Sequence, residues 1–187
     1  MNKIITESLN QHREAVAFLE SNCQLLEKIA GIFIETLKQK GKVIFMGNGG
    51  SAADAQHLAA ELIGRFKLNR APLAALALST NTSTITAVGN DFGFKEVFAR
   101  QVEALTEARD CIVGISTSGK SENVIIAIKK AKEIGAKTIG FLGKDGGDLA
   151  KIVDLPLIVS VNDTPRIQEM HLLAGHIICE IVEKELC

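Results

Sequence analysis

The sequence predicts a doubly wound α/β fold, in which helices cover both faces of a parallel sheet. After residue 40, short apolar runs of strand length alternate with longer segments of helical periodicity. Runs such as 111–115 are almost entirely apolar, which is typical of parallel strands that are buried on both sides. Ligands of this fold class bind beyond the carboxyl ends of the strands, so we expect a functional site in the loops that follow these runs.

The first 40 residues are predicted to form one or two long helices. Apolar side chains recur there at helical spacing from about residue 4, with no proline and only one glycine, Gly31. Such helices need a surface on which to bury their apolar stripe, which favours packing against a partner chain. We therefore expect a helical oligomerisation segment at 1–40 and an α/β core at 41–187, within a single domain.

The rest of the chain alternates between strands and helices, without an internal repeat, a linker or a low-complexity segment. Asn90 and Asp91 belong to a segment whose composition predicts a turn, in which Asp91 would be a cap or turn residue. Five strands are expected, at 42–47, 74–78, 110–116, 137–142 and 154–160. Five helices are expected, at 51–64, 82–89, 94–107, 121–134 and 164–185.

Composition argues against several classes of partner. The 187 residues carry a formal net charge of −1, and no basic cluster contains interleaved aromatic residues, so we expect no nucleic-acid partner. No segment is long enough to span a bilayer, and the first residues lack the apolar region of a signal peptide. The four cysteines are scattered without metal-binding spacing, as expected of reduced thiols. These features predict a cytoplasmic protein without a membrane partner.

The segment 47–62, GNGGSAADAQHLAAEL, is the most informative part of the sequence. An apolar run leads into glycines, and an alanine-rich stretch begins at Ser51, which predicts a strand, a turn and a helix. The free N–H groups at the start of such a helix can bind an anion. His57 and Glu61 are four residues apart and share a face of this helix. They could serve acid–base chemistry, bind one face of a zinc ion or form a polar stripe, and the preceding loop favours a functional role.

A second loop of the same kind follows the run 110–116. It places four hydroxyl groups within six residues ahead of a helix, on Ser116, Thr117, Ser118 and Ser121. One hydroxyl would suffice to cap the helix, so the set favours binding of phosphate oxygens. The segment from Gly114 to Ser121 also matches the nucleotide-binding pattern GxxxxGK[ST]. Gly114 lies inside the apolar run, however, and no later run ends in a metal-binding aspartate, so an NTPase is disfavoured.

The last helix carries several polar residues among apolar ones, namely Arg166, Gln168, Glu169, His171 and His176. Buried polar groups without partners cost about 1–3 kcal/mol each, so these side chains need solvent or partners. Exposure would explain Glu169 and His171, and a hydrogen-bonded core position is an alternative for His176. Gln168 and His176 are about 12 Å apart on an ideal helix. Both can contact one ligand only from its two ends, or if a neighbouring subunit contributes.

Taken in order, these motifs resemble those of the phosphoheptose isomerases of the sugar isomerase (SIS) superfamily. The resemblance spans nearly the whole chain and is carried by 47–62, by GNDFGF at 89–94, GISTSGKSENV at 114–124, GKDGG at 143–147 and RIQEMH at 166–171. It implies a flavodoxin-like SIS fold with a five-stranded parallel sheet, and a homotetramer with active sites at subunit interfaces. It also implies conversion of sedoheptulose 7-phosphate into D-glycero-D-manno-heptose 7-phosphate, the first step toward the heptose of bacterial lipopolysaccharide.

The resemblance further implies roles for individual residues. Glu61 and His176 match the catalytic pair of the family. Its zinc ligands, for one ion per subunit, correspond to His57, Glu61, Gln168 and His176. The phosphate would be bound by Ser116, Thr117, Ser118 and Ser121. The remaining substrate contacts would come from Asn48, Gly49, Gly50, Ser51, Glu61, Asn90, Asp91 and Gln168.

The implied reaction moves a proton between C1 and C2 of the sugar through an enediol. Such a reaction needs a base at carbon and a donor or metal that stabilises the oxygens. We expect Glu61 to move the carbon-bound proton and His176 the oxygen-bound proton, with zinc polarising the carbonyl; the choice of forward base stays open. Lys120 departs from the family, in which a small polar residue is expected, and could add charge beside the phosphate.

Two other functions are compatible with the same fold. Non-catalytic SIS scaffolds that bind the bacterial replication initiator DnaA lack the matching glutamate and terminal histidine. The presence of Glu61 and His176 therefore favours the enzyme. A regulatory sugar-phosphate sensor would need a DNA-binding or similar appendage, for which 187 residues leave no room.

Overall fold

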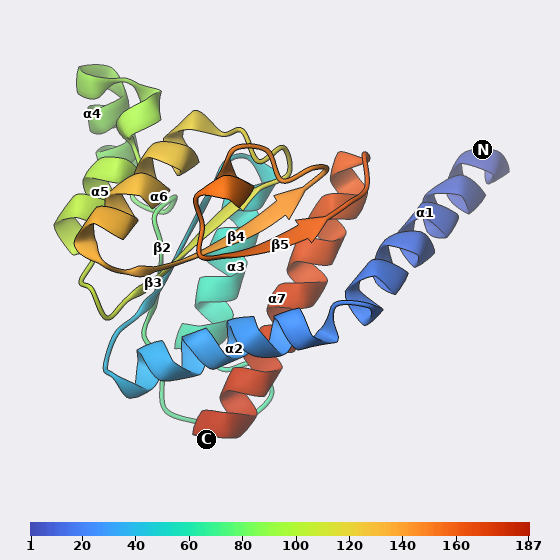
Figure 1. Ribbon diagram of the computed structural model, residues 1–187, viewed down its shortest axis with the longest axis horizontal. Coiled ribbons are helices and arrows are strands. Elements are labelled where there is room, and N and C mark those ends of the chain that lie inside the picture. Colours follow the sequence, from blue (N-terminus) through green and yellow to red (C-terminus); the bar gives the residue numbers. More distant parts are fainter.

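The computed structural model describes all 187 residues and has a five-stranded sheet at its centre (Figure 1). The strands are β1 (Val43–Gly47), β2 (Ala75–Ala77), β3 (Cys111–Ser116), β4 (Lys137–Gly143) and β5 (Leu155–Val159). Their order is β2-β1-β3-β4-β5, and all neighbouring pairs are parallel. This confirms the predicted doubly wound fold. The winding direction changes between β1 and β3, where such folds bind their ligands.

Helices cover both faces of the sheet. The helix α3 (Gly50–Ile63) follows β1, α6 (Glu122–Ile134) follows β3, and α7 (Thr164–Leu186) ends the chain. The others are α1 (Asn2–Glu20), α2 (Cys23–Lys38), α4 (Thr82–Phe92) and α5 (Ala99–Leu105), with short 3-10 turns η1 (Phe94–Glu96) and η2 (Leu149–Lys151). Apolar residues of α2, α3 and α7 form one core with the sheet, and those of α5 and α6 form a second core on its other face.

Each strand contributes side chains to both cores, because successive side chains of a strand point to opposite faces of the sheet. On β1, Val43 and Phe45 belong to the core with α3 and α7, whereas Ile44 and Met46 belong to the core with α6. All five residues of β1 and all six of β3 are buried. The near-continuous apolar runs in the sequence therefore have the expected cause, a sheet that is covered on both sides.

The N-terminal segment forms two helices, as predicted. Ala15 and Leu19 of α1 are buried in the core with α7, but Ile4, Ile5 and Leu9 are exposed. The first turns of α1 extend beyond the rest of the chain, with the N-terminus at the far end (Figure 1). No helix combines the length and the apolar character that a membrane crossing requires.

Two predicted elements differ from the structure. The helix expected at 82–89 continues to Phe92, so Asn90 and Asp91 lie in its last turn and the prediction of a turn there was wrong. The helix ends at Gly93, whose φ of 89° suits glycine. The single helix expected at 94–107 is divided into η1 and α5. The residues at the break, Val97 and Phe98, are 0% and 3% exposed, so packing into the second core overrides helical periodicity there.

Candidate active site

The turn between β1 and α3 brings free backbone groups to the carboxyl edge of the sheet. A Cβ on Gly47 would lie 2.7 Å from the carbonyl oxygen of Ser51, so the tight turn requires glycine at that position. Gly49 precedes α3 with a φ of 56°, and no side chain caps the helix there. Gly49 and Gly50 are exposed, Ser51 is 7% exposed and Asn48 is half-buried. The start of α3 is therefore available to a polar ligand.

The hydroxyl-rich loop after β3 lies beside this turn, because β1 and β3 are neighbours in the sheet. The hydroxyls of Ser116 and Ser121 are 2.9 Å apart, and those of Ser116 and Ser118 are 3.5 Å apart. Ser121 stands at the start of α6 but makes no capping hydrogen bond, so helix capping does not account for the hydroxyl set. Thr117 is half-buried in the same loop. The loop gathers hydroxyl donors at an uncapped helix N-terminus, an arrangement suited to phosphate.

Glycines allow the loop after β3 to lie against the turn that follows β4. Gly119 has a φ of 64°, and a Cβ there would lie 2.0 Å from the carbonyl oxygen of Gly146. A Cβ on Gly143 would lie 2.5 Å from the carbonyl oxygen of Thr117. The GKDGG segment at 143–147 thus packs directly against the hydroxyl loop. Larger residues at Gly119 or Gly143 would displace the loop.

Gly114 serves packing rather than nucleotide binding. It lies within β3, aligned with Met46 of β1 and Gly140 of β4. A Cβ at this position would lie 2.7 Å from Cγ1 of Val124 on α6. Gly114 therefore permits the close approach of α6 to the sheet and is not the first glycine of a phosphate loop. This removes the observation on which the NTPase alternative depended.

A pair of amides joins the two loops. Asn48 Nδ2 donates to Asn123 Oδ1, and Asn123 Nδ2 donates to Asn48 Oδ1, both at 2.9 Å. Asn123 is 3% exposed and lies in the first turn of α6. The reciprocal bonds hold the turn after β1 and the start of α6 in one arrangement. Sequence reasoning did not single out Asn123.

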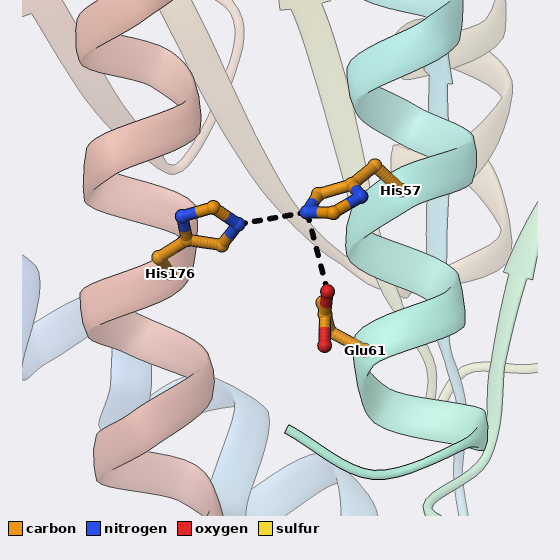
Figure 2. A group of neighbouring side chains, drawn as sticks. All are labelled: His57, Glu61 and His176. Carbon is orange, nitrogen blue, oxygen red and sulfur yellow. Dashed lines mark hydrogen bonds and ion pairs between the residues drawn. The ribbon is translucent and has the colours of Figure 1, made fainter. Parts of the chain in front are cut away.

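His57, Glu61 and His176 converge in the space between α3 and α7 (Figure 2). The Nε2 atoms of His57 and His176 are 2.7 Å apart, and Glu61 Oε1 lies 3.2 Å from His57 Nε2. Two imidazole nitrogens at this distance repel each other unless a proton or a cation lies between them. The three donor atoms lie within 4.8 Å of one another, so this group could hold a metal ion.

The environment of His176 favours its neutral form. Burial lowers the pKa of the imidazole, the nearby His57 lowers it further, and Glu61 acts in the opposite direction. A neutral imidazole can accept a proton or bind a metal ion. The side chains of His57 and Glu61 are 44% and 21% exposed, so small molecules can reach the group.

Gly175 explains how the two helices come close enough to form this group. A Cβ on Gly175 would lie 2.5 Å from Cδ2 of Leu58. Gly175 and Leu58 each directly adjoin a histidine of the group, at His176 and His57. Contact of α7 with α3 through a glycine therefore sets the distance between the two imidazoles.

Gln168 lies at the other end of this part of α7. Its Nε2 donates to Asp54 Oδ1 at 3.3 Å, and its amide lies against Gly50, where a Cβ would be 2.5 Å away. Eight residues separate it from His176, which is about 12 Å along a helix. Gln168 is thus placed beside the turn after β1, while its predicted part in a metal site stays a prediction.

Asp54 is a buried carboxyl group that sequence reasoning overlooked. It is 6% exposed, and its Oδ2 has no hydrogen-bond partner. Burial raises its pKa, against the opposing effects of the Gln168 hydrogen bond and the charge of His57. Its position in an alanine-rich helical segment gave no signal beyond an ordinary surface aspartate.

Asn90 and Asp91 are exposed at the end of α4. Asn90 Nδ2 donates to Asp91 Oδ1 at 2.7 Å. The structure thus pairs these two predicted substrate contacts with each other, and their predicted contact with substrate stays a prediction.

The two histidines of α7 have environments opposite to those considered from the sequence. His171 is fully buried, and its Nε2 donates to the carbonyl oxygen of Leu142 at 2.9 Å, so the expected exposure was wrong. Burial lowers the pKa of His171 to about 4. His176 is only half-buried and belongs to the cluster with His57, so it is not a core histidine. Five residues turn a helix by about 140°, so the two side chains leave it in different directions.

Comparison with known proteins agrees with this architecture. Residues 9–143 match the family described as SIS domain. The chain is 52% identical to the phosphoheptose isomerase of Aliarcobacter butzleri over 187 residues, which cover 100% of this chain and 99% of that protein. It is 51% identical to the phosphoheptose isomerase of Helicobacter pylori strain P12 over 185 residues, or 98% of this chain and 96% of that protein.

Two solved structures are similar over nearly the whole chain. The phosphoheptose isomerase GmhA from Neisseria gonorrhoeae has a TM-score of 0.88 and 43% identity, and the alignment covers 98% of this chain and 96% of that one. A phosphoheptose isomerase from Francisella tularensis has a TM-score of 0.89 and 35% identity, with the same coverage of 98% and 96%.

Proposed function

This chain belongs to the phosphoheptose isomerases of the SIS domain family, and we propose that it converts sedoheptulose 7-phosphate into D-glycero-D-manno-heptose 7-phosphate. The observation that carries the proposal is the convergence of His57, Glu61 and His176 between α3 and α7. These groups lie on α3 and α7, which begin near the carboxyl ends of β1 and β5. The two polar loops lie at the same edge of the sheet. The product would enter the synthesis of lipopolysaccharide heptose. The DnaA-binding scaffold has no support among the relatives, which are named isomerases.

The phosphate is bound by the loop after β3 in this proposal. Ser116, Thr117, Ser118 and Ser121 supply hydroxyl groups, and the uncapped start of α6 supplies backbone N–H groups. Binding at the phosphate end of the substrate contributes energy that holds the reacting carbons in register.

The sugar hydroxyls are bound by the turn after β1 and its surroundings. The contributing residues are Asn48, Gly49, Gly50, Ser51, Asn90, Asp91 and Gln168. The amide pair between Asn48 and Asn123 supports this division, because it couples the sugar-binding turn to the phosphate-binding helix. One substrate molecule could then contact both loops.

Glu61 and His176 carry out the proton transfers. Glu61 takes a proton from C1 of the ketose and returns one to C2, and His176 moves the proton between the two oxygens, through an enediol. The reverse reaction uses the same groups in the opposite order. The lowered pKa of His176 supports this role, because a neutral imidazole can accept the oxygen-bound proton.

A zinc ion is the proposed cofactor, one per subunit. Two imidazoles and one carboxylate on facing helices are a ligand set that zinc prefers, and Gln168 is the fourth proposed ligand. When bound, zinc would polarise the substrate carbonyl and stabilise negative charge on the oxygens.

The protein is proposed to act as a cytoplasmic homotetramer, with residues 1–40 as the helical oligomerisation segment of a single SIS domain. The exposed Ile4, Ile5 and Leu9 on the projecting part of α1 support this, since they form an apolar surface that a second copy could cover. Sites at the subunit interfaces would bring further groups to Gln168. The four free cysteines are consistent with a reducing compartment.

One assay tests the function directly. Purified protein is incubated with sedoheptulose 7-phosphate, with and without a chelator, and aldoheptose phosphate is detected by NMR. We expect product without the chelator and loss of product with it, restored by added zinc. No product under any condition would contradict the isomerase, whereas full activity after metal removal would contradict only the role of zinc.

A further inference from the structure

The loop between α3 and β2 folds back onto the last turns of α7, where it surrounds one buried carboxylate. Glu183 is 1% exposed, and it accepts hydrogen bonds from the backbone N–H groups of Phe66, Lys67 and Leu68 at 3.1, 2.7 and 2.9 Å. Arg70 Nε donates to the same carboxylate at 2.9 Å. Three successive N–H groups directed at one carboxylate define the path of the backbone around it.

Arg70 connects this arrangement to α3. Its guanidinium donates to the carbonyl oxygens of Glu61 and Leu62, at 2.9 and 2.8 Å. These carbonyls belong to the last turn of α3, where intrahelical partners are missing. The side chains of Arg70 and Glu183 are only 3% and 1% exposed, so water does not compete for their contacts. The end of α3, the loop and the end of α7 are therefore held together.

The loop places an aromatic ring on His176. The rings of Phe66 and His176 are stacked, with centroids 5.5 Å apart and an angle of 28° between their planes. His176 and Glu183 are seven residues apart on α7 and therefore share one face of the helix. The carboxylate that fixes the loop thus lies two turns from the imidazole that the loop covers. Phe66 contacts the face of this imidazole, whereas His57 contacts its Nε2.

We infer that Phe66 is a positioning residue for His176: its ring holds the imidazole so that Nε2 points to His57, and the Glu183–Arg70 pair holds Phe66 in place. The inference rests on the proposed role of His176 in proton transfer. An imidazole on a helix surface can rotate about two side-chain torsions, and only some rotamers present Nε2 to the reacting atoms. The ring of Phe66, stacked on one face of the imidazole, limits the rotamers that His176 can adopt and excludes water from that face.

The first test compares Phe66→Leu with Phe66→Tyr. Leucine keeps apolar bulk but removes the flat ring, so we expect kcat to fall about ten- to a hundredfold, with KM for sedoheptulose 7-phosphate changed less than about twofold. Tyrosine keeps the ring and should restore kcat to within about threefold of the original protein. A Phe66→Leu enzyme with unchanged kcat would overturn the inference, and so would an equal loss in both variants.

The second test does not depend on turnover. Ring protons of His176 that lie over an aromatic face have shifted NMR frequencies, and we expect Phe66→Leu to remove this shift and Phe66→Tyr to keep it. Absence of the shift in the unsubstituted protein would contradict the inference. If that protein shows the shift but does not isomerise the sugar, the proposed function fails while the contact is confirmed.

A third pair of variants tests the role of the buried Glu183 carboxylate, which holds the loop. Glu183→Gln removes the charge that the loop surrounds, so we expect kcat to fall in the same direction as for Phe66→Leu and the His176 shift to weaken. Glu185→Gln is the matched control, because Glu185 is an exposed glutamate of α7, two residues after Glu183, and the same substitution there removes a charge that the loop does not surround. We expect its kcat to be unchanged. Equal kcat values in the two variants would contradict the role of Glu183 in holding the loop.

Discussion

The loop after β3 and the helix pair α3–α7 are two parts of the proposed site that are built in different ways. The loop consists of consecutive residues, and its shape depends on backbone approaches such as that of Gly119 to Gly146. The cluster between the helices joins His57 to His176, which are 119 positions apart. A surface for an anion can be made from one short segment, because backbone and hydroxyl donors suffice. A group that transfers protons needs particular side chains, and here only tertiary packing brings them together.

The largest expected effect is on the helix pair alone. Glu61→Gln keeps the size of the side chain but removes the base, so we expect kcat to fall about a thousandfold or more. Binding of a phosphorylated sugar, measured by calorimetry, should change little, because the loop after β3 is untouched. The control is Glu103→Gln, an exposed position on α5. Retained turnover in Glu61→Gln would disprove the assignment of the base.

The second largest effect is expected from a change in the loop after β3, which leaves the helix pair untouched. In Gly119→Ala the new Cβ would lie 2.0 Å from the carbonyl oxygen of Gly146 at a φ of 64°, so we expect about 2–5 kcal/mol of destabilisation and a KM raised tenfold or more. Gly135→Ala is the comparison, because Gly135 has a left-handed φ of 91° but an added Cβ there would make only an ordinary contact, 3.6 Å from Cβ of Ala108. It should cost only about 1–2 kcal/mol. Urea unfolding measures both, and equal losses would show that backbone strain, not contact with Gly146, determines the loop.

His171 joins α7 to Leu142 of β4, and its contribution to stability depends on pH. The buried ring has a pKa of about 4 in the folded protein, below its ordinary value of 6.5, so the unfolded chain binds a proton that the folded one does not. Its contribution is therefore fully present above about pH 6.5 and is lost as the pH falls toward 4, to a total of about 3 kcal/mol.

The His171→Gln variant tests this contribution, because glutamine keeps a donor for the carbonyl oxygen of Leu142 and does not titrate. The difference in unfolding free energy between the two proteins should shift in favour of the variant between pH 6.5 and 4. A difference that stays constant over this range would show that His171 is not the group that titrates.

The smallest expected effect concerns Lys120, which is exposed in the hydroxyl loop. If its charge assists phosphate binding, Lys120→Asn should raise KM about two- to fivefold, in line with the small free energy of exposed ion pairs. Added salt should remove this difference, since salt screens exposed charges. A KM that is equal in both proteins at low salt would leave Lys120 without a part in binding.

The sequence predicted most of the fold because the strands of a parallel sheet are apolar throughout, and each expected strand overlaps an observed one within two residues at either end. The errors fall where packing overrides local pattern. Val97 and Phe98 break a helix in order to enter the second core, and Asn90 and Asp91 extend one despite a turn-like composition.

From residue spacing alone, the site was predictable only where its chemistry is local, and the grouping of His176 with His57 and Glu61 was implied by the family resemblance. The hydroxyl loop and the pair of His57 and Glu61 are visible in short segments. His171 and His176 both lie among apolar residues, and their different environments depend on what faces each side of α7. Phe66 and Glu183 gave no signal, because their contact joins residues 117 positions apart.

The length of α7 has a consequence for how this protein can vary. Gln168, His171, His176 and Glu183 lie on one uninterrupted helix of 23 residues. One residue inserted between His171 and His176 would rotate everything after it by about 100° and move it by about 1.5 Å. His176 would turn away from α3, and Glu183 would leave the loop that surrounds it. This span of α7 therefore admits substitutions but neither insertions nor deletions.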